Sequence, residues 1–291
     1  MATETTTTAA LCSQETDIIS TTLTFWKNLT SPPAPLDFTQ PGTEKIFDDL
    51  NKLNETVPIM IHDIRGCESN FSLEKNGFQY VDHDIPGLEK CKTDDEIREV
   101  LIPATEELVK KITGAYRTLV FTHRIRNLAS DTSKRADNRA PAHSVHTDFT
   151  SAGALQHLST VIKDPDTLTS LTNPNIRVLA INVWRPLKRI QKDPLAICDW
   201  RSFNPSCIIP NRMIFPGGFW NELGKVKYEA GQKWYTLKGQ MPSEPVVFKQ
   251  FDSRVPEGGM TVPHSAFVDP EWVDKEARES VEIKMFAFVE E

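Results

Sequence analysis

The sequence has no long hydrophobic run, since polar or charged residues interrupt every apolar stretch before the roughly 20 residues that a membrane-spanning helix needs. It also has no block of basic residues, and its formal net charge of −7 is spread along the chain. Such a chain is not expected to bind nucleic acid or an anionic membrane. The first residues are rich in threonine and lack the basic and apolar regions of a secretory signal peptide, so none is expected.

Cysteine is scarce and shows no pattern. The chain has five cysteines, an odd number without any Cys-x-x-Cys spacing: Cys12, Cys67, Cys91, Cys198 and Cys207. This argues against a zinc ribbon and a disulfide framework, and it is typical of reduced thiols in a reducing compartment. Together with the lack of a signal peptide, it predicts a cytoplasmic protein, and 291 residues are enough to bury a substantial core.

Short β-like runs joined by polar connections fill most of the chain after residue 140, where helical patterns are few. The most β-like run is residues 176–184, and we expect further strands at residues 246–251, 260–262 and 281–289. Many short strands of this kind are typical of a barrel or a double-sheet jelly roll. The pattern predicts a mostly β (α+β) fold with a double-stranded β-helix (cupin-like jelly roll) core and flanking helices.

The N-terminal half contains the clearest helical pattern. Apolar residues recur at helical spacing over residues 95–113, and Asp94-Asp95 could cap the start of this helix. Before it, the turn dipeptide Asn76-Gly77 separates two β-like stretches and predicts a small β unit. We expect the helix to pack outside the β core.

The chain is expected to form one domain over residues 19–291, preceded by a flexible polar leader at residues 1–18. A polar and charged loop spans residues 127–142. This loop could close over a ligand as a lid, or it could remain an ordinary solvated loop. The sequence leaves both readings open.

His146 and Asp148 stand two residues apart, so on a strand their side chains share one face. With the distant His264 they would form a 2-His-1-carboxylate set, which leaves three positions open on Fe(II) for oxygenase chemistry. A lone His-x-Asp is more often structural than a metal site. His143, three residues before His146, lacks a partner two positions on and is not expected to be a ligand.

Arg278 and Ser280 follow His264 and strengthen this interpretation. A guanidinium binds a carboxylate through two parallel hydrogen bonds and keeps its charge in a dry pocket. Ser280 shares the strand face of Arg278 and could donate to the same carboxylate, such as that of an oxo-acid cosubstrate. Arg185, at the end of the most β-like run, could bind an acidic substrate or assist the cosubstrate, or it could be a surface residue before Pro186.

In these residues the chain resembles the Fe(II)/2-oxoglutarate-dependent dioxygenases, whose pattern is His-x-Asp/Glu, a distant His and an Arg beyond it. More specifically, it resembles the fungal AsaB hydroxylase/desaturase family, which includes gibberellin desaturase-like and CmcJ-like proteins. The resemblance covers roughly residues 55–290. The matching blocks are residues 146–150, 181–187, 193–199, 233–235, 241–244, 263–267 and 278–282.

The resemblance implies that His146, Asp148 and His264 hold Fe(II), while Arg278 and Ser280 bind 2-oxoglutarate. It further implies an enzyme that uses O2 to hydroxylate, desaturate or oxidatively cyclise a small natural product in fungal secondary metabolism. The interval between Asp148 and His264 is longer than in many such enzymes, which implies an insertion around residues 200–240.

Two other functions remain open at this point. One is a catalytically silent partner subunit of a heterodimeric dioxygenase, for which a broken metal triad or a missing arginine would be diagnostic. The other is a zinc- or nickel-dependent cupin-type isomerase or hydrolase, which would need no oxo-acid site. Homo- or heterodimerisation is compatible with the sequence, which does not reveal the oligomeric state or the substrate.

Overall fold

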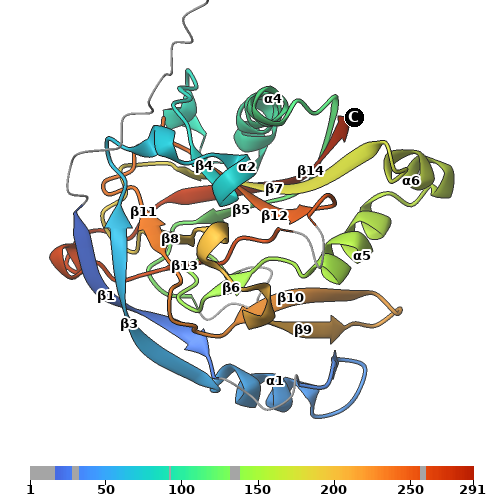
Figure 1. The fold of residues 1–291 in the computed structure, drawn as a ribbon, viewed down its shortest axis with the longest axis horizontal. Coiled ribbons are helices and arrows are strands. Elements are labelled where there is room, and N and C mark those ends of the chain that lie inside the picture. Colours follow the sequence, from blue (N-terminus) through green and yellow to red (C-terminus); the bar gives the residue numbers. More distant parts are fainter. Residues whose placement is uncertain (1–16, 28–32, 92, 132–137, 256–259) are drawn as a thin grey trace, which may run out of the picture.

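Two β-sheets form the centre of the structure, and helices lie outside them (Figure 1). The computed structural model describes residues 17–27, 33–91, 93–131, 138–255 and 260–291. The larger sheet of this part has nine strands, in the spatial order β1 (Ile18–Trp26), β3 (Asn54–Asp63), β11 (Trp234–Thr236), β8 (Leu195–Cys198), β13 (His264–Ala266), β6 (His146–Thr147), β10 (Trp220–Val226), β9 (Ile208–Ile214) and β2 (Leu36–Asp37). The smaller sheet has five, in the order β4 (Phe78–Tyr80), β12 (Val246–Asp252), β7 (Ile176–Pro186), β14 (Ser280–Glu290) and β5 (Arg117–Arg126). The prediction of a mostly β fold with flanking helices is confirmed.

Helices connect and cover the sheets. The α-helices of the described residues are α1 (Thr43–Asn51), α2 (Leu73–Asn76), α3 (Asp94–Glu96), α4 (Ile102–Thr113), α5 (Ser151–Val161) and α6 (Pro165–Leu171). A π-helical turn, η3 (Ile97–Leu101), joins α3 to α4. Short 3₁₀ turns are η1 (Glu68–Asn70), η2 (Leu88–Lys90), η4 (Trp200–Ser202), η5 (Pro205–Cys207) and η6 (Pro270–Trp272).

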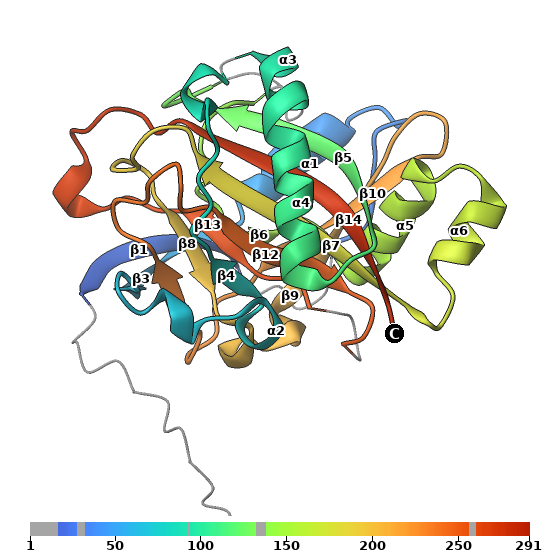
Figure 2. The ribbon, with the colours of Figure 1, turned by 90° about the horizontal axis from the view of Figure 1, so that it is seen from above.

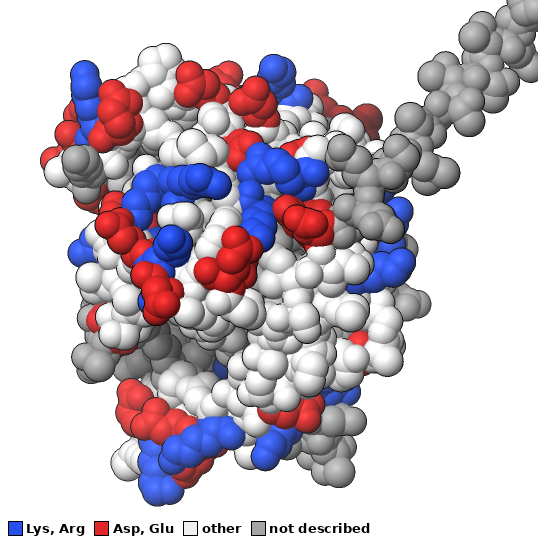
Figure 3. All heavy atoms as spheres, turned by 90° about the vertical axis from the view of Figure 1, so that its left-hand side faces the viewer, with Lys and Arg blue, Asp and Glu red and all other residues white. Residues whose placement is uncertain are grey.

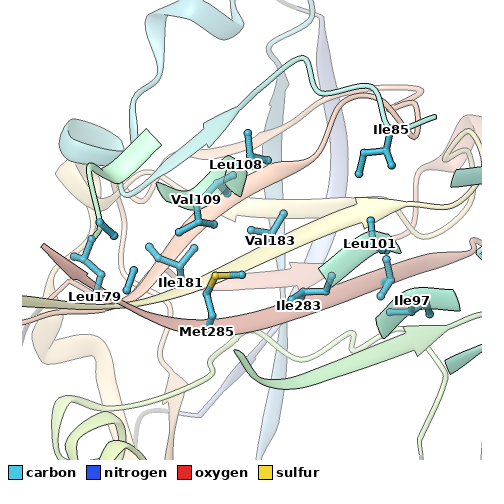
Figure 4. Close-up of a cluster of buried hydrophobic side chains, with 14 of the residues drawn as sticks. Ile85, Ile97, Leu101, Leu108, Val109, Leu179, Ile181, Val183, Ile283 and Met285 are labelled. Atoms are coloured by element: carbon cyan, nitrogen blue, oxygen red, sulfur yellow. The ribbon is translucent and has the colours of Figure 1, made fainter. Parts of the chain in front are cut away.

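Successive side chains along each strand of the smaller sheet point alternately to its two faces. On the outer face, apolar residues of β7 and β14 pack against η3 and α4, which lie across the sheet (Figures 2 and 4). Fully burying each such side chain stabilises the fold by roughly 1.5–3 kcal/mol. The cluster includes Ile97, Leu101, Leu108, Val109, Leu179, Ile181, Val183, Ile283 and Met285. The intervening residues of β7 and β14 therefore face the larger sheet.

The predicted helix over residues 95–113 is present as the continuous run α3, η3 and α4. Its N-cap is Thr93 rather than Asp94 or Asp95. The Thr93 hydroxyl accepts the Glu96 backbone N–H, and the Glu96 carboxylate accepts the Thr93 backbone N–H, which is a capping box. The two aspartates lie in the first turn, where negative charge is favoured by the helix dipole.

The small β unit expected around Asn76-Gly77 is only half right: the second stretch forms β4, but the dipeptide ends helix α2 and makes no hairpin turn. Gly77 has φ +81° and occupies the left-handed position that commonly follows a helix. The Asn76 side chain is buried and donates to the carboxylate of Asp199, at a distance of 2.9 Å. This tertiary hydrogen bond holds Asn76 at the end of a helix and not in the expected hairpin turn.

The strand expected at residues 260–262 is also wrong: β13 begins only at His264. Pro263 has no N–H to donate, so it cannot continue a ladder on that side. Residues 200–240, the expected insertion, contribute β9, β10 and β11 to the larger sheet, with β10 paired to β6. Most of the expected leader lies outside the described residues, as do residues 132–137 of the loop.

Three described cysteines are free and buried: Cys91, Cys198 and Cys207. Cys67 is disulfide-bonded, so the expectation of reduced thiols is wrong for this residue. Within the described ranges, none of the helices combines the length and apolar character needed to cross a membrane. On the face shown in Figure 3, basic and acidic side chains are interspersed.

Candidate metal centre and adjoining pocket

Two neighbouring strands of the larger sheet place two histidines directly opposite each other. His146 on β6 pairs with His264 on β13, and their ring centroids are 4.4 Å apart. Asp148 follows β6, and its carboxylate oxygens lie 4.0 Å from Nε2 of His146 and 3.6 Å from Nε2 of His264. One ligand atom from each residue lies within 4.8 Å of the others. The three residues could therefore hold one metal ion, as their sequence spacing predicted.

Both imidazoles are oriented by the same kind of hydrogen bond. Nδ1 of His146 is 2.8 Å from the carbonyl oxygen of Ser144, and Nδ1 of His264 is 3.1 Å from that of Val262. A carbonyl only accepts, so Nδ1 carries the proton in each ring. This leaves the lone pair of each Nε2 directed toward the centre, which is the tautomer that a metal ligand requires.

The environment also sets the charge states that metal binding needs. Burial, together with the neighbouring His264, lowers the pKa of His146 to about 3. Burial lowers the pKa of His264 as well, although Asp148 opposes this. Burial alone would raise the pKa of Asp148, but Lys284 and the two histidines hold it well below its usual range. At neutral pH the centre therefore consists of two neutral imidazoles and a carboxylate.

Asp148 is held from the opposite sheet. Nζ of Lys284 on β14 lies 2.6 Å from Oδ1, and Gln250 on β12 donates its amide N–H to Oδ2. Asn182 on β7 adds a longer contact of 3.4 Å to Oδ2. These three residues were missed by the sequence analysis. One signal was present, since Glu282 and Lys284 interrupt an otherwise apolar strand at alternate positions.

A small pocket adjoins the metal ligands. Its walls include both histidines, Trp184, Arg126, Arg278 and Glu282. Glu282 is buried between Arg126, 3.1 Å away, and Lys284, 3.4 Å away. Burial would raise its pKa, but Lys284 and Arg126 lower the pKa to about 2, so Glu282 is ionised at neutral pH.

Arg278 and Ser280 are both buried; Arg278 lines this pocket, whereas Ser280 is not among its lining residues. Nη1 of Arg278 donates to the carbonyl of Asp193 at 2.6 Å, and the guanidinium lies 5.3 Å from the Trp184 ring. Burial lowers the pKa of Arg278 to about 9, which keeps it charged at neutral pH. Nε of Arg278 and Oγ of Ser280 have no hydrogen-bond partner among the described residues. A buried polar atom without a partner costs about 1–3 kcal/mol, so this pair fits an anionic ligand such as a carboxylate.

The structure does not bring Arg185 to this pocket. On β7 it follows Trp184, so its side chain leaves the opposite face of the sheet. Its Nη1 donates to the carbonyls of His83 and Pro242, at 2.9 and 2.7 Å. His143 is not part of the metal cluster either; its Nε2 lies 3.4 Å from the carboxylate of Asp193.

A 2-His-1-carboxylate cluster beside an arginine pocket defines a mononuclear metalloprotein of the facial-triad class. A family model described as an oxidoreductase/YMDC permease-like domain matches residues 23–288. The hydroxylase/desaturase efuI of Hormonema carpetanum is 31% identical over 259 residues, covering 81% of this chain and 85% of efuI. The hydroxylase/desaturase asaB of Aspergillus flavus is 31% identical over 255 residues, covering 81% of this chain and 82% of asaB.

A solved structure is similar over nearly the whole chain. The iron and alpha-ketoglutarate-dependent endoperoxidase NvfI superposes with a TM-score of 0.77 and 25% identity, covering 96% of this chain and 100% of that chain. The chain belongs to the fungal hydroxylase/desaturase family of dioxygenases that depend on alpha-ketoglutarate, another name for 2-oxoglutarate. The family membership predicted from the sequence motifs is confirmed.

The lowered pKa of His146 predicts a pH-dependent stability of the metal-free protein. Below pH 6.5 an unfolded histidine binds a proton, whereas the folded His146 resists protonation down to about pH 3. Between pH 7.5 and 5.5 this residue should lower the free energy of unfolding by about 1.4 kcal/mol. Urea denaturation at both pH values, in the presence of a chelator, measures this change in the free energy of unfolding. In His146→Gln this contribution should vanish; equal pH dependence in both proteins would contradict the assignment.

Gln250→Leu should weaken metal binding, because Oδ2 of Asp148 loses a donor that fixes the carboxylate. Loss of such a supporting partner typically lowers metal affinity by about 10–100-fold. Isothermal titration of the metal-free protein with Fe(II) under anaerobic conditions measures the change. Gln79→Leu, on the neighbouring strand β4, is the control and should bind as tightly as the wild type. A folded Gln250→Leu protein with unchanged affinity would show that Asp148 needs no support from β12.

Proposed function

We propose that this protein is an Fe(II)- and 2-oxoglutarate-dependent oxygenase. His146, Asp148 and His264 hold the metal, while Arg278 and Ser280 bind the distal carboxylate of 2-oxoglutarate. The observation that carries the proposal is a buried polar atom without a partner among the described residues, Nε of Arg278, on a residue that lines one pocket together with both histidines. Oγ of Ser280, two residues further on, is also buried and without a partner among the described residues. NvfI, a structural relative, is itself iron- and alpha-ketoglutarate-dependent.

In the proposed fold, the two sheets form a double-stranded β-helix core within one domain. The supporting observations are the contacts that cross between the sheets: Lys284 on β14 with Asp148, and Phe248 on β12 with the ring of His264 at 4.8 Å. The segment around residues 200–240 is an insertion in this scheme, and its hairpin of β9 and β10 extends the larger sheet beside β6.

Each residue has a defined task in this proposal. The neutral imidazoles and the Asp148 carboxylate present three ligand atoms on one side of the centre and leave the pocket side open for cosubstrate and O2. Arg278 offers a positive charge at neutral pH, and Trp184 covers the guanidinium face and excludes water. When bound, Fe(II) and 2-oxoglutarate supply the oxidising chemistry that acts on a substrate C–H bond.

The reaction that we propose is hydroxylation, desaturation or oxidative cyclisation of a small natural product in secondary metabolism. Support comes from the relatives efuI and asaB, both hydroxylase/desaturases. The complete triad and the buried arginine do not favour a catalytically silent subunit. A zinc- or nickel-dependent isomerase would leave the Arg278 and Ser280 pair without a ligand.

Turnover of 2-oxoglutarate tests the proposal directly. The protein with added Fe(II), 2-oxoglutarate and O2 should release succinate, slowly without substrate and faster when a panel of fungal metabolites includes a suitable one. Succinate detected by mass spectrometry is the readout. Asp148→Ala should bind iron poorly and release no succinate, while its circular dichroism stays like that of the wild type. Full activity in Asp148→Ala would exclude this residue as a ligand.

Arg278→Ala should raise the KM for 2-oxoglutarate by about 10–100-fold, because a charge-assisted hydrogen bond contributes roughly 1.5–3 kcal/mol. Arg278→Lys keeps the charge but loses the planar fork, so its KM should lie between those of the wild type and Arg278→Ala. Succinate formation at increasing 2-oxoglutarate concentration gives these values. An unchanged KM in Arg278→Ala would mean that another residue binds the cosubstrate.

A further inference from the structure

The turn between β7 and β8 contains an unusual backbone conformation. Asp193 has φ +51° and is the one non-glycine residue with positive φ in the described part of the chain. Residues with a Cβ atom rarely adopt this region. Pro194 follows directly, and a proline restricts the preceding residue toward extended conformations. Asp193 is therefore held in a doubly unfavourable conformation, which points to a function for the turn.

The unusual conformation coincides with a contact to Arg278. The backbone carbonyl of Asp193 accepts a hydrogen bond from Nη1 of Arg278 at 2.6 Å. Asp193 itself is buried, with 7% of its surface exposed. This contact and the Trp184 ring, 5.3 Å away, fix the guanidinium on two sides. Nε has no partner among the described residues, and Arg278 is one of the residues that line the pocket.

The turn is also tied to the strands that carry the metal ligands. The carbonyl of Pro194 accepts the backbone N–H of Phe267 at 3.1 Å. Immediately afterwards, β8 pairs with β13, and Ile197 lies opposite His264. Any change in the path of the chain at residues 193–194 would therefore move the Arg278 partner relative to His264.

We infer that Asp193 is a positioning residue for the cosubstrate: its left-handed backbone directs a carbonyl at Nη1 of Arg278 and thereby aims the remaining edge of the guanidinium at the distal carboxylate of 2-oxoglutarate. This inference rests on the proposed function. It assigns the effect to the backbone conformation of Asp193 and not to its carboxylate, which lies 3.4 Å from Nε2 of His143.

Substitutions that differ in their tolerance of positive φ test the inference. Asp193→Val disfavours the left-handed region, because a β-branched side chain clashes there. Asp193→Asn and Asp193→Gly tolerate this region and lack the negative charge. We expect the Kd for 2-oxoglutarate to rise at least tenfold in Asp193→Val and to stay within about threefold of wild type in the other two.

The measurement is an anaerobic titration of the Fe(II)-loaded protein with 2-oxoglutarate, followed by the visible charge-transfer absorption of the complex. The kcat at saturating 2-oxoglutarate should change little in Asp193→Val. In an Arg278→Ala background, Asp193→Val should cause no further loss of affinity, because the two residues act through one contact. If Asp193→Val does not fold, Asp193→Ala serves in its place, with an expected rise of at least threefold.

Three results would overturn the inference. The first is wild-type affinity in the folded Asp193→Val or Asp193→Ala protein. The second is an equal loss in Asp193→Asn and Asp193→Gly, which would assign the effect to the carboxylate. The third is an additive loss in the Arg278→Ala background. If the wild type itself binds no 2-oxoglutarate, the proposed function fails and this inference fails with it.

Discussion

The ion pair between Asp148 and Lys284 is the contact on which the rest of the site depends. Asp148 follows a strand of the larger sheet, Lys284 belongs to the smaller sheet, and Nζ lies 2.6 Å from Oδ1. A buried carboxylate without a compensating charge would destabilise the fold by several kcal/mol. In the absence of a metal, Lys284 supplies that charge, so the carboxylate can stay ionised between the sheets. The same contact joins the two sheets at the place where chemistry is proposed to occur.

The smaller sheet serves two purposes through the alternation of its side chains. In β14 the residues at odd positions, such as Ile283 and Met285, pack against the helix on the outer face. The residues at even positions, such as Glu282 and Lys284, form the polar wall of the metal centre. One strand therefore contributes both to the hydrophobic core and to the site. A substitution that disturbs the outer packing will also move the polar wall.

The pairs His146–Asp148 and Arg278–Ser280 could be picked out from the sequence as candidates because the two residues of each pair are only two positions apart. In the structure Asp148 comes just after β6, which carries His146, and Arg278 comes just before β14, which begins at Ser280. The supporting residues Gln250 and Lys284 could not be predicted, because their role arises only when one sheet packs on the other. Arg185 was misplaced for a related reason, since its position in β7 directs it to the outer face beside His83.

Predictions from short sequence patterns were wrong where tertiary contacts determined the local structure. Asn76-Gly77 has the composition of a hairpin turn, but the hydrogen bond from Asn76 to Asp199 holds it at the end of a helix. The apolar character of residues 260–262 reflects burial, and the ladder forms only after Pro263. The mostly β architecture was nevertheless predictable, because it depends on the pattern of many runs together.

Because His146 lies directly opposite His264, the metal centre can form only when the strands of the larger sheet pair in the correct register. Successive side chains on a strand point to opposite faces, so a slip of β6 by a single residue would turn His146 away from its partner. A chain trapped in that alignment could not assemble the three-ligand cluster. Ferrous ion present during folding would therefore stabilise only molecules whose strands have met in the correct alignment, and metal uptake would act as selection for the native sheet.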